Sequence, residues 1–237
     1  MSTRCMIAIE NNTTNKAVKK YAGIYCHSDG YISFVGMILH CFYSDEQLVR
    51  SLLGLGALSA IGPVLGKRID MRKSFVDTDY YSRVVGQCRA YYRDAGQEFE
   101  VIETNDRNVF LSESYFYLFR NGEWYYRGGD AKRLSKVSVA LRNDKEACDA
   151  ELQNYIYDFC DNDHKRIFIA KLKELGICKI KPTKLYDYTI LGKLPNGEYR
   201  IKCNINNSRT ELDKEGIRGL IEEGSTVDTV NANKEYV

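Results

Sequence analysis

The residues best suited to chemistry lie together at positions 25–31, in the segment YCHSDGY at the end of a predicted strand. Side chains at the ends of strands commonly carry function. A histidine with a carboxylate nearby can act as a general base or orient a ligand, so His27 and Asp29 are the catalytic residues if the protein is an enzyme. The structural alternative is an Asp-Gly turn in which Asp29 caps the following helix and His27 packs partly exposed.

The other reactive side chains add no catalytic or metal-binding group. Cys26 adjoins His27, but neighbouring strand residues point to opposite faces, so this adjacency cannot make a catalytic pair. His40 falls in an apolar run typical of a core, and His164 is interpreted as a polar surface residue. The 8 cysteines form no CxxC pair and no zinc-finger spacing with histidine, so no metal site is predicted. Neither GxGxxG nor a Walker loop is present, and no cofactor is predicted.

Two clusters of basic residues lie beside tyrosines, which suits a nucleotide or a single-stranded nucleic acid because arginine binds phosphate and tyrosine stacks on bases. The clusters are Lys67, Arg68, Arg72 and Lys73, and then Arg127, Lys132, Arg133, Lys136 and Arg142. The alternative is an ordinary solvated surface, since aspartates are interspersed among these residues. The expected ligand-binding residues of the chain are Tyr25, His27, Asp29, Tyr31, Tyr91, Arg93, Tyr125 and Arg127.

Length and charge restrict the class of protein. A chain of 237 residues with 44% hydrophobic and 28% charged residues is typical of a globular protein and has room for two modest domains. A net charge of +2 predicts neither duplex nucleic acid nor a membrane as partner. The 18 tyrosines suit half-exposed strands, interfaces and stacking sites.

Apolar runs in the chain are short. The first one, Cys5 to Ile9, is too short for a secretory signal, and none approaches the roughly 20 residues that a membrane span needs. The cysteines are therefore expected to be reduced thiols in a cytosol.

The expected fold class is α+β, mainly an antiparallel sheet with packed helices, plus a smaller α+β C-terminal unit. Strands at 4–10 and 21–27 form a hairpin, and Gly30 takes a positive φ in the turn that follows. The dense apolar residues of 34–43 predict a buried helix.

Local signals continue beyond this helix. Residues 44–46 cap another helix that ends at Gly54 or Gly56. Two strands at 84–93 and 97–104 are expected to form a hairpin. The strongest local signal is the aromatic hairpin at 115–127, where Asn121-Gly122 predicts a type I′ turn.

The expected domains are 1–135 and 136–237. The second is predicted to hold two helices, a hairpin, a short helix with a capping box from Thr210 to Asp213, and an edge strand. In chain order these elements are expected at 144–160, 162–175, 186–205, 210–223 and 226–230.

Several motifs between residues 1 and 130 carry a resemblance. They are Thr3-Arg4, Ile7-Ala8-Ile9, Tyr25-x-His27-x-Asp29-Gly30-Tyr31, Val35-Gly36, Leu55-Gly56-x-Leu58-Ser59-x-Ile61-Gly62, Arg93-Asp94-x-Gly96 and the hairpin motif YLFxNGxWY. Together they resemble a group of small, largely uncharacterised proteins of bacteriophages and prophages. Members commonly carry an aromatic residue and a proline where Ser28 and Ile32 stand here. The resemblance implies a phage origin and raises the expectation that His27 and Asp29 matter.

Three functional hypotheses follow. The leading one is a phage-encoded binding protein that counters a host defence system in the host cell cytoplasm, by sequestering a signal nucleotide or by inhibiting a host defence protein. The second is an enzyme acting on a phosphoester or nucleotide, with His27 as base and Asp29 orienting it. The third is a structural or regulatory phage protein. A homo-oligomer is also expected, because an exposed aromatic hairpin at 115–126 would need cover.

Overall fold

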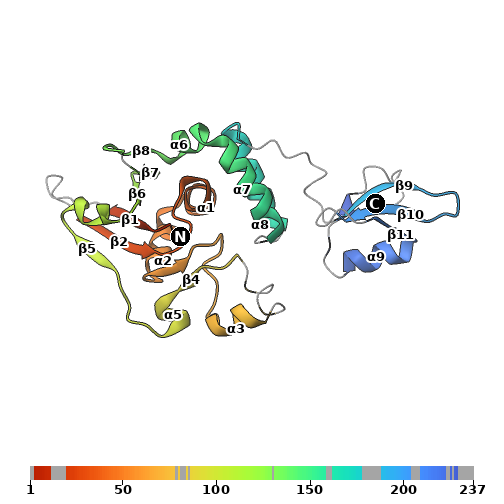
Figure 1. The fold of residues 1–237 in the computed structure, drawn as a ribbon, viewed down its shortest axis with the longest axis horizontal. Helices are drawn as coiled ribbons and strands as arrows, with labels where there is room; N and C mark the ends of the chain where they lie inside the picture. Colours follow the sequence, from red (N-terminus) through yellow and green to blue (C-terminus); the bar gives the residue numbers. More distant parts are fainter. Residues whose placement is uncertain are drawn as a thin grey trace. The chain divides into compact units, whose positions relative to one another are not determined.

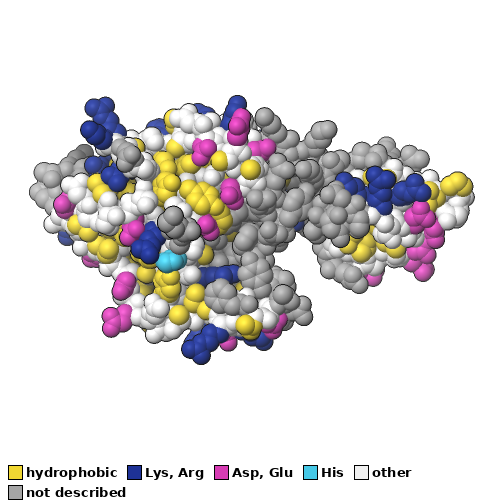
Figure 2. All heavy atoms as spheres, viewed as in Figure 1, with side chains coloured by type: hydrophobic (Ala, Val, Ile, Leu, Met, Phe, Trp, Pro, Cys, Tyr) yellow, Lys and Arg dark blue, Asp and Glu magenta, His cyan; other side chains and the backbone are white. Residues whose placement is uncertain are grey.

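The chain forms two compact units, Met1–Cys160 with Ile167–Cys178, and Asp161–Arg166 with Lys179–Val237 (Figure 1). Basic and acidic side chains are interspersed over the visible face of the first unit (Figure 2), so that face carries no continuous basic surface. The computed structural model describes residues 3–11, 20–77, 80, 84, 86–129, 131–158, 162–177, 188–203, 209–222, 225 and 227–228.

A mixed sheet forms the centre of the first unit. Its neighbouring strands are mostly antiparallel, but β1 pairs with β6 in parallel and β2 pairs with β3 in parallel. The strand order is β4 (Arg89–Ala90), β3 (Leu58–Ala60), β2 (Lys20–Cys26), β1 (Cys5–Asn11), β6 (Tyr115–Arg120), β7 (Glu123–Gly128) and β8 (Ser135–Lys136), with β5 (Ile102–Thr104) paired to β2.

Helical segments lie against this sheet and around its ends (Figure 1). They are a π-helical turn η1 (Ile32–Gly36), α1 (Met37–Phe42), α2 (Glu46–Leu53), α3 (Met71–Val76), α5 (Tyr91–Ala95), a 3₁₀ segment η2 (Arg107–Ser112), α6 (Val137–Asn143), α7 (Lys145–Asp158) and α8 (Asn162–Glu174). The buried helix expected at 34–43 is thus found as η1 and α1, with every residue of η1 buried.

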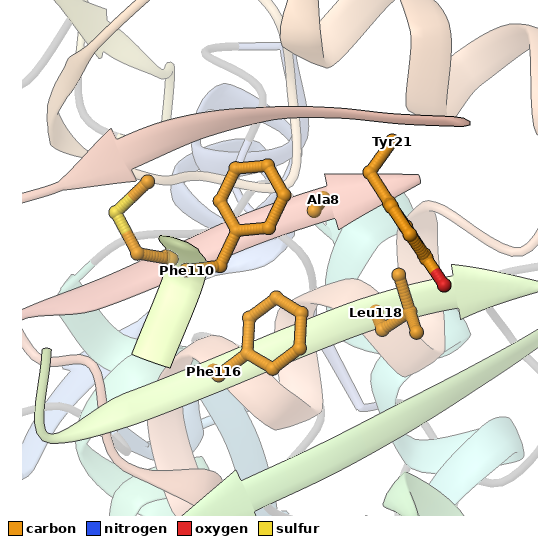
Figure 3. Packing of buried hydrophobic residues seen from close by; sticks show 6 residues of the cluster. Ala8, Tyr21, Phe110, Phe116 and Leu118 are labelled. Atoms are coloured by element: carbon orange, nitrogen blue, oxygen red, sulfur yellow. The ribbon is translucent and has the colours of Figure 1, made fainter. Parts of the chain in front are cut away.

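One face of the sheet is covered by η2. Alternation along a strand places every second side chain on this face, and those side chains pack against Phe110. The rings of Phe110 and Phe116 stack with their centroids 5.7 Å apart. The buried cluster, shown in Figure 3, is Met6, Ala8, Tyr21, Phe110, Phe116 and Leu118.

The opposite face is covered by α2 and by η1 with α1. The buried side of α2 carries Val49, Leu52 and Leu53, and α2 contacts β1 and β2. Asp45 caps the helix, because its carboxylate accepts hydrogen bonds from the backbone N–H groups of Gln47 and Leu48. Gly54 follows at the C-terminus, as the sequence predicts.

The β6–β7 hairpin confirms the strongest local prediction. Asn121 and Gly122 have φ of 53° and 77°, the signs that a type I′ turn requires. The hairpin was expected to be exposed and to need cover in a homo-oligomer, but Phe116 to Phe119 are buried within the chain. The premise for a homo-oligomer, an aromatic hairpin exposed to solvent, is therefore wrong.

Residues 84–104 do not form the expected hairpin. β4 covers only two residues, and the helix α5 follows it directly and ends at Gly96, whose φ is 68°. β5 pairs with β2 and not with β4. The glycine therefore ends a helix and does not turn a hairpin, because Asp94 is held in the interior by partners distant in sequence.

The described residues of the second unit include a four-stranded sheet and the helix α9 (Lys214–Glu222). Its buried cluster is Ile190, Tyr199, Ile201 and Ile217. The strand order is β11 (Arg209–Leu212), β10 (Tyr199–Cys203), β9 (Tyr188–Lys193) and β12 (Val227–Asp228). β9 and β10 form the predicted hairpin, and β12 lies at the sheet edge, paired in parallel with β9.

The cap of α9 differs from the expected capping box. The Asp213 carboxylate accepts a hydrogen bond from the N–H of Gly216 at 2.8 Å. Thr210 lies within β11, opposite Ile201.

The two units together confirm an α+β fold. The boundary expected between residues 135 and 136 falls inside the first unit, because α6 contacts β7 and η1, and α7 contacts η1. The helices expected at 144–160 and 162–175 are present as α7 and α8.

Candidate functional site

The segment at residues 25–31 begins with the last two residues of β2 and continues beyond the end of that strand. A hydrogen bond of 3.0 Å joins the Tyr25 hydroxyl to Nδ1 of His27. The backbone N–H of His27 donates to the carbonyl of Leu58 at 2.9 Å, which ties the residue to β3. Burial raises the pKa of Tyr25, while Arg4 lowers it and Glu113 and Tyr91 raise it. The structure therefore brings Tyr25, His27 and Tyr91 into one neighbourhood.

Asp29, and not Gly30, has the positive φ in the turn after β2. The φ of Asp29 is 56°. Glycine is needed at position 30 for space, because a Cβ there would lie 2.8 Å from the Cβ of Cys5 and 2.9 Å from the carbonyl carbon of Arg4. The Gly30 carbonyl accepts a hydrogen bond from the buried Tyr117 hydroxyl at 2.9 Å. The turn is thus fixed by close backbone contact.

Tyr31 connects this turn to α7. Its hydroxyl donates to the Glu151 carboxylate at 3.2 Å. Burial raises the pKa of Tyr31, and the negative charges of Asp29 and Glu151 raise it further. Burial also raises the pKa of Asp29. Tyr31 therefore contacts an acidic residue of α7 and lies near Asp29, whereas Tyr25 and His27 hydrogen-bond to each other.

Tyr125 and Arg127 lie on the same η2-covered face of the sheet as Tyr25, but several strands away from it. The paired positions Tyr25, Met6, Phe116 and Arg127 form one row across four strands. Three interstrand steps of about 4.8 Å separate its ends, which places Arg127 roughly 14 Å from Tyr25. The Arg120 guanidinium lies over the ring of Tyr125, at 4.3 Å. The structure therefore does not bring these residues to His27.

Arg93 is occupied by the chain itself. Its guanidinium donates to the Asp94 carboxylate, to the carbonyls of Leu65 and Gly66, and to the carbonyl of Cys88. These contacts hold the 65–66 segment against α5. Arg93 is thus a structural residue and not the anion donor that the sequence suggests.

A cavity of about 650 Å³ lies beside α3 and α5. Arg68 and Arg72 line it together with Tyr80, and neither guanidinium forms an ion pair or hydrogen bond within the described part of the chain. The other lining residues are Ile69, Asp70, Met71, Asp94 and Ala95.

Local contacts build this cavity. The Asp70 carboxylate caps α3 by accepting from the N–H of Lys73 at 3.0 Å, and the N–H of Asp70 donates to the Tyr80 hydroxyl at 2.8 Å. The Lys73 ammonium lies 5.1 Å from the centre of the Tyr80 ring. The ring and the loop carrying the arginines are therefore held in register. The first basic cluster of the sequence signalled this site, but the short helix α3 was not expected.

The carboxylates that line this cavity are already engaged. The side chain of Asp94 is 0% exposed and accepts from the N–H groups of Ile69 and Ala90 and from Arg93. Asp70 is engaged as the α3 cap. Arg93 neutralises Asp94, and Arg68 and Arg72 outnumber Asp70, so the described lining of the cavity carries a net positive charge.

The buried thiols of Cys5, Cys88 and Cys148 are not activated nucleophiles. Burial raises the pKa of Cys88 to about 11 and that of Cys148 to about 12, and it raises the pKa of Cys5 well above its ordinary value. A thiol with a raised pKa is protonated at neutral pH, whereas catalysis needs the thiolate. Among the described residues, no disulfide is formed by Cys5, Cys26, Cys41, Cys88, Cys148 or Cys203.

The described residues include neither a metal-binding cluster nor a membrane-spanning helix. No three histidine, cysteine or acidic side chains among them converge to hold a metal ion. Of their helices, none combines the length and apolar character needed to cross a membrane.

Comparisons with models of protein families, with curated proteins and with solved structures found no match to this chain. The geometry of its own residues is therefore the basis for a functional assignment.

Proposed function

We propose that this chain is a phage-encoded binding protein that counters a host defence system in the host cell cytoplasm by sequestering an anionic signal nucleotide. The observation that carries the proposal is the cavity beside α3 and α5, where Arg68 and Arg72 lie beside Tyr80 and find no partner among the residues that the structure describes. The phage origin and the defence system rest on the resemblance of residues 1–130 to phage proteins.

The chemistry of the cavity suits a nucleotide. A guanidinium offers parallel N–H donors that match two phosphate oxygens, and a tyrosine ring offers a stacking plane for a base. The cavity volume of about 650 Å³ lies within the range of roughly 300–1,000 Å³ that holds small organic ligands. Because Arg93 neutralises Asp94 and the two arginines outnumber Asp70, the net charge of the described lining attracts phosphate.

The test is a binding screen of the purified protein against linear and cyclic nucleotides, read as a shift in thermal unfolding. A ligand at about 100 times its dissociation constant stabilises the fold by roughly 2.7 kcal/mol. Each stabilising mixture is then chromatographed. Recovery of the nucleotide unchanged is the expected outcome, whereas an altered nucleotide would contradict sequestration.

Matched variants locate the site. Arg68→Ala and Arg72→Ala are each expected to weaken binding by about tenfold or more, since each removes charge-assisted hydrogen bonds. Lys67→Ala removes an equal charge next to Arg68 but outside the cavity lining, and it should bind like the parent chain. Equal weakening in all three variants would contradict the site, and an absence of binding across the panel would favour a host defence protein as the partner.

The hydrogen bond between Tyr25 and His27 favours a second candidate function, an enzyme acting on a phosphoester or nucleotide. It fixes the orientation of the imidazole, as a general base requires. His27→Ala should then abolish turnover of any substrate found in the screen, and Tyr25→Phe should lower it. Unchanged turnover in His27→Ala would end this candidate.

A further inference from the structure

A second, smaller cavity of about 230 Å³ lies in the first unit where α1, β7, β8, α6 and α8 meet. Its volume is about a third of that of the cavity beside α3 and α5. The lining residues are His40, Ser44, Gly122, Glu123, Trp124, Lys136, Ser138 and Lys171.

Four polar side chains around this cavity lack a partner. Within the described residues, no hydrogen bond or ion pair is formed by the side chains of His40, Ser44, Ser138 or Lys171. Ser44 is exposed and the other three side chains are half-buried, so all four are open to a ligand that enters the cavity. Cavities with a few convergent polar groups are where proteins commonly bind small ligands.

The other polar lining groups are already paired. The Lys136 ammonium and the Glu123 carboxylate form an ion pair of 2.8 Å. The Trp124 indole N–H donates to the carbonyl of Tyr43 at 2.7 Å. The groups left for a ligand are therefore one ammonium, two hydroxyls and one imidazole.

The charge in this cavity is positive. Because Lys136 and Glu123 neutralise each other, Lys171 leaves a net positive charge in the lining. The charges around His40 are also mainly positive. Burial lowers the pKa of His40, the cations Lys171 and Arg142 lower it further, and the anion Glu174 raises it. A positive field with hydroxyl donors attracts an anion.

We propose that this cavity binds a small tetrahedral oxyanion of the phosphate class. Its donors come from several elements around the cavity and so surround an anion, which suits four tetrahedral oxygens better than a planar carboxylate. The cavity is smaller than the roughly 300 Å³ at which pockets for small organic molecules begin, so it fits a phosphoryl group and not a whole nucleotide. This site is independent of the proposed nucleotide cavity.

The chain carries its own probe of this site. Trp124 is the single tryptophan of the sequence and lines the cavity. Its fluorescence is followed while phosphate or sulfate replaces chloride at constant ionic strength, which removes general screening effects. A saturable change with both oxyanions is expected. A change that does not saturate, or no change, would overturn the proposal.

Two lysines of α8 make a matched pair of variants. Lys171→Met removes the ammonium that lines the cavity, and binding of both oxyanions should weaken by about tenfold or more. Lys173→Met removes an exposed lysine of the same helix that does not line the cavity, and it should bind like the parent chain. Equal affinities in the two variants would overturn the site.

A final comparison separates a free ion from a phosphoryl group carried by a larger molecule. The same titration is made with phosphoserine. Affinity equal to that for inorganic phosphate assigns the site to the free ion, and tighter binding of phosphoserine assigns it to a carried phosphoryl group. Stronger binding of acetate than of phosphate or sulfate would exclude the tetrahedral class.

Discussion

At the scale of single residues, the YCHSDGY segment divides its side chains between two environments. Tyr25 and His27 hydrogen-bond to each other at the end of β2, whereas Tyr31 reaches Glu151 of α7. Asp29 lies in this second environment, in a left-handed backbone conformation, with a carboxylate that burial disfavours. His27 and Asp29 are therefore close in sequence but have different surroundings.

Asp29→Asn is expected to stabilise the protein at neutral pH. Burial raises the pKa of Asp29, so the folded state favours the protonated form, and stability is lost as pH rises above the ordinary pKa of 3.8. Asparagine tolerates the left-handed conformation and carries no charge. Thermal unfolding should show a higher midpoint for the variant at pH 7 and a smaller difference near pH 4. A lower midpoint at pH 7 would show that the carboxylate has a stabilising role.

At the scale of elements, Asp94 joins three parts of the chain. Its carboxylate accepts from Ile69 before α3, from Ala90 of β4 and from Arg93 of α5. The guanidinium of Arg93 then extends the network to the 65–66 segment. One buried ion pair therefore positions the loop that carries Arg68.

Asp94→Ala is expected to lower the free energy of unfolding by about 3 kcal/mol or more, because it leaves a buried guanidinium and two N–H groups without their acceptor. Denaturant unfolding measures this loss. Asp45→Ala is the comparison, since it removes an exposed helix cap of α2 and should cost only about 1 kcal/mol. Similar losses for both variants would contradict the role given to Asp94.

At the scale of the whole molecule, the first unit has its own core and includes residues up to Cys178. A chain that ends there is expected to fold. Because Trp124 is the only tryptophan and lies in the first unit, its fluorescence reports on that unit alone. The fluorescence of the truncated protein should show the same unfolding midpoint as the fluorescence of the full chain. If the truncated protein shows no cooperative unfolding transition, the first unit does not fold independently.

Acid stability is a second property of the whole molecule. His40 has a lowered pKa in the folded state through burial, Lys171 and Arg142, opposed by Glu174. The unfolded chain therefore binds more protons below the ordinary pKa of 6.5, and stability falls as pH drops through that value. The free energy of unfolding is measured with denaturant at pH 8 and pH 5.5, in buffers without phosphate or sulfate. Its loss between the two pH values should be smaller for His40→Gln than for the parent chain. Identical losses would contradict this assignment.

The sequence by itself determined the elements whose signals are local. The β6–β7 hairpin follows from Asn121-Gly122, because the two-residue turn selects the register of both strands. The helix α2 follows from its cap at Asp45 and its apolar spacing, and β1–β2 and β9–β10 follow from short apolar segments on either side of a polar connection. In each case the residues that decide the structure lie within one helix or within two strands that follow each other in the chain.

The tertiary structure decided the rest, because the deciding contacts join residues far apart in the chain. The helix α5 replaced an expected hairpin when the Asp94 carboxylate paired with Ile69, 25 residues earlier. Tyr31 reaches Glu151 across 120 residues, and Arg127 is separated from Tyr25 by two intervening strands. Residue types indicated arginine beside tyrosine, but only the folded chain selects the arginines that are free to bind. A side chain is available to a ligand only when the fold gives it no other partner.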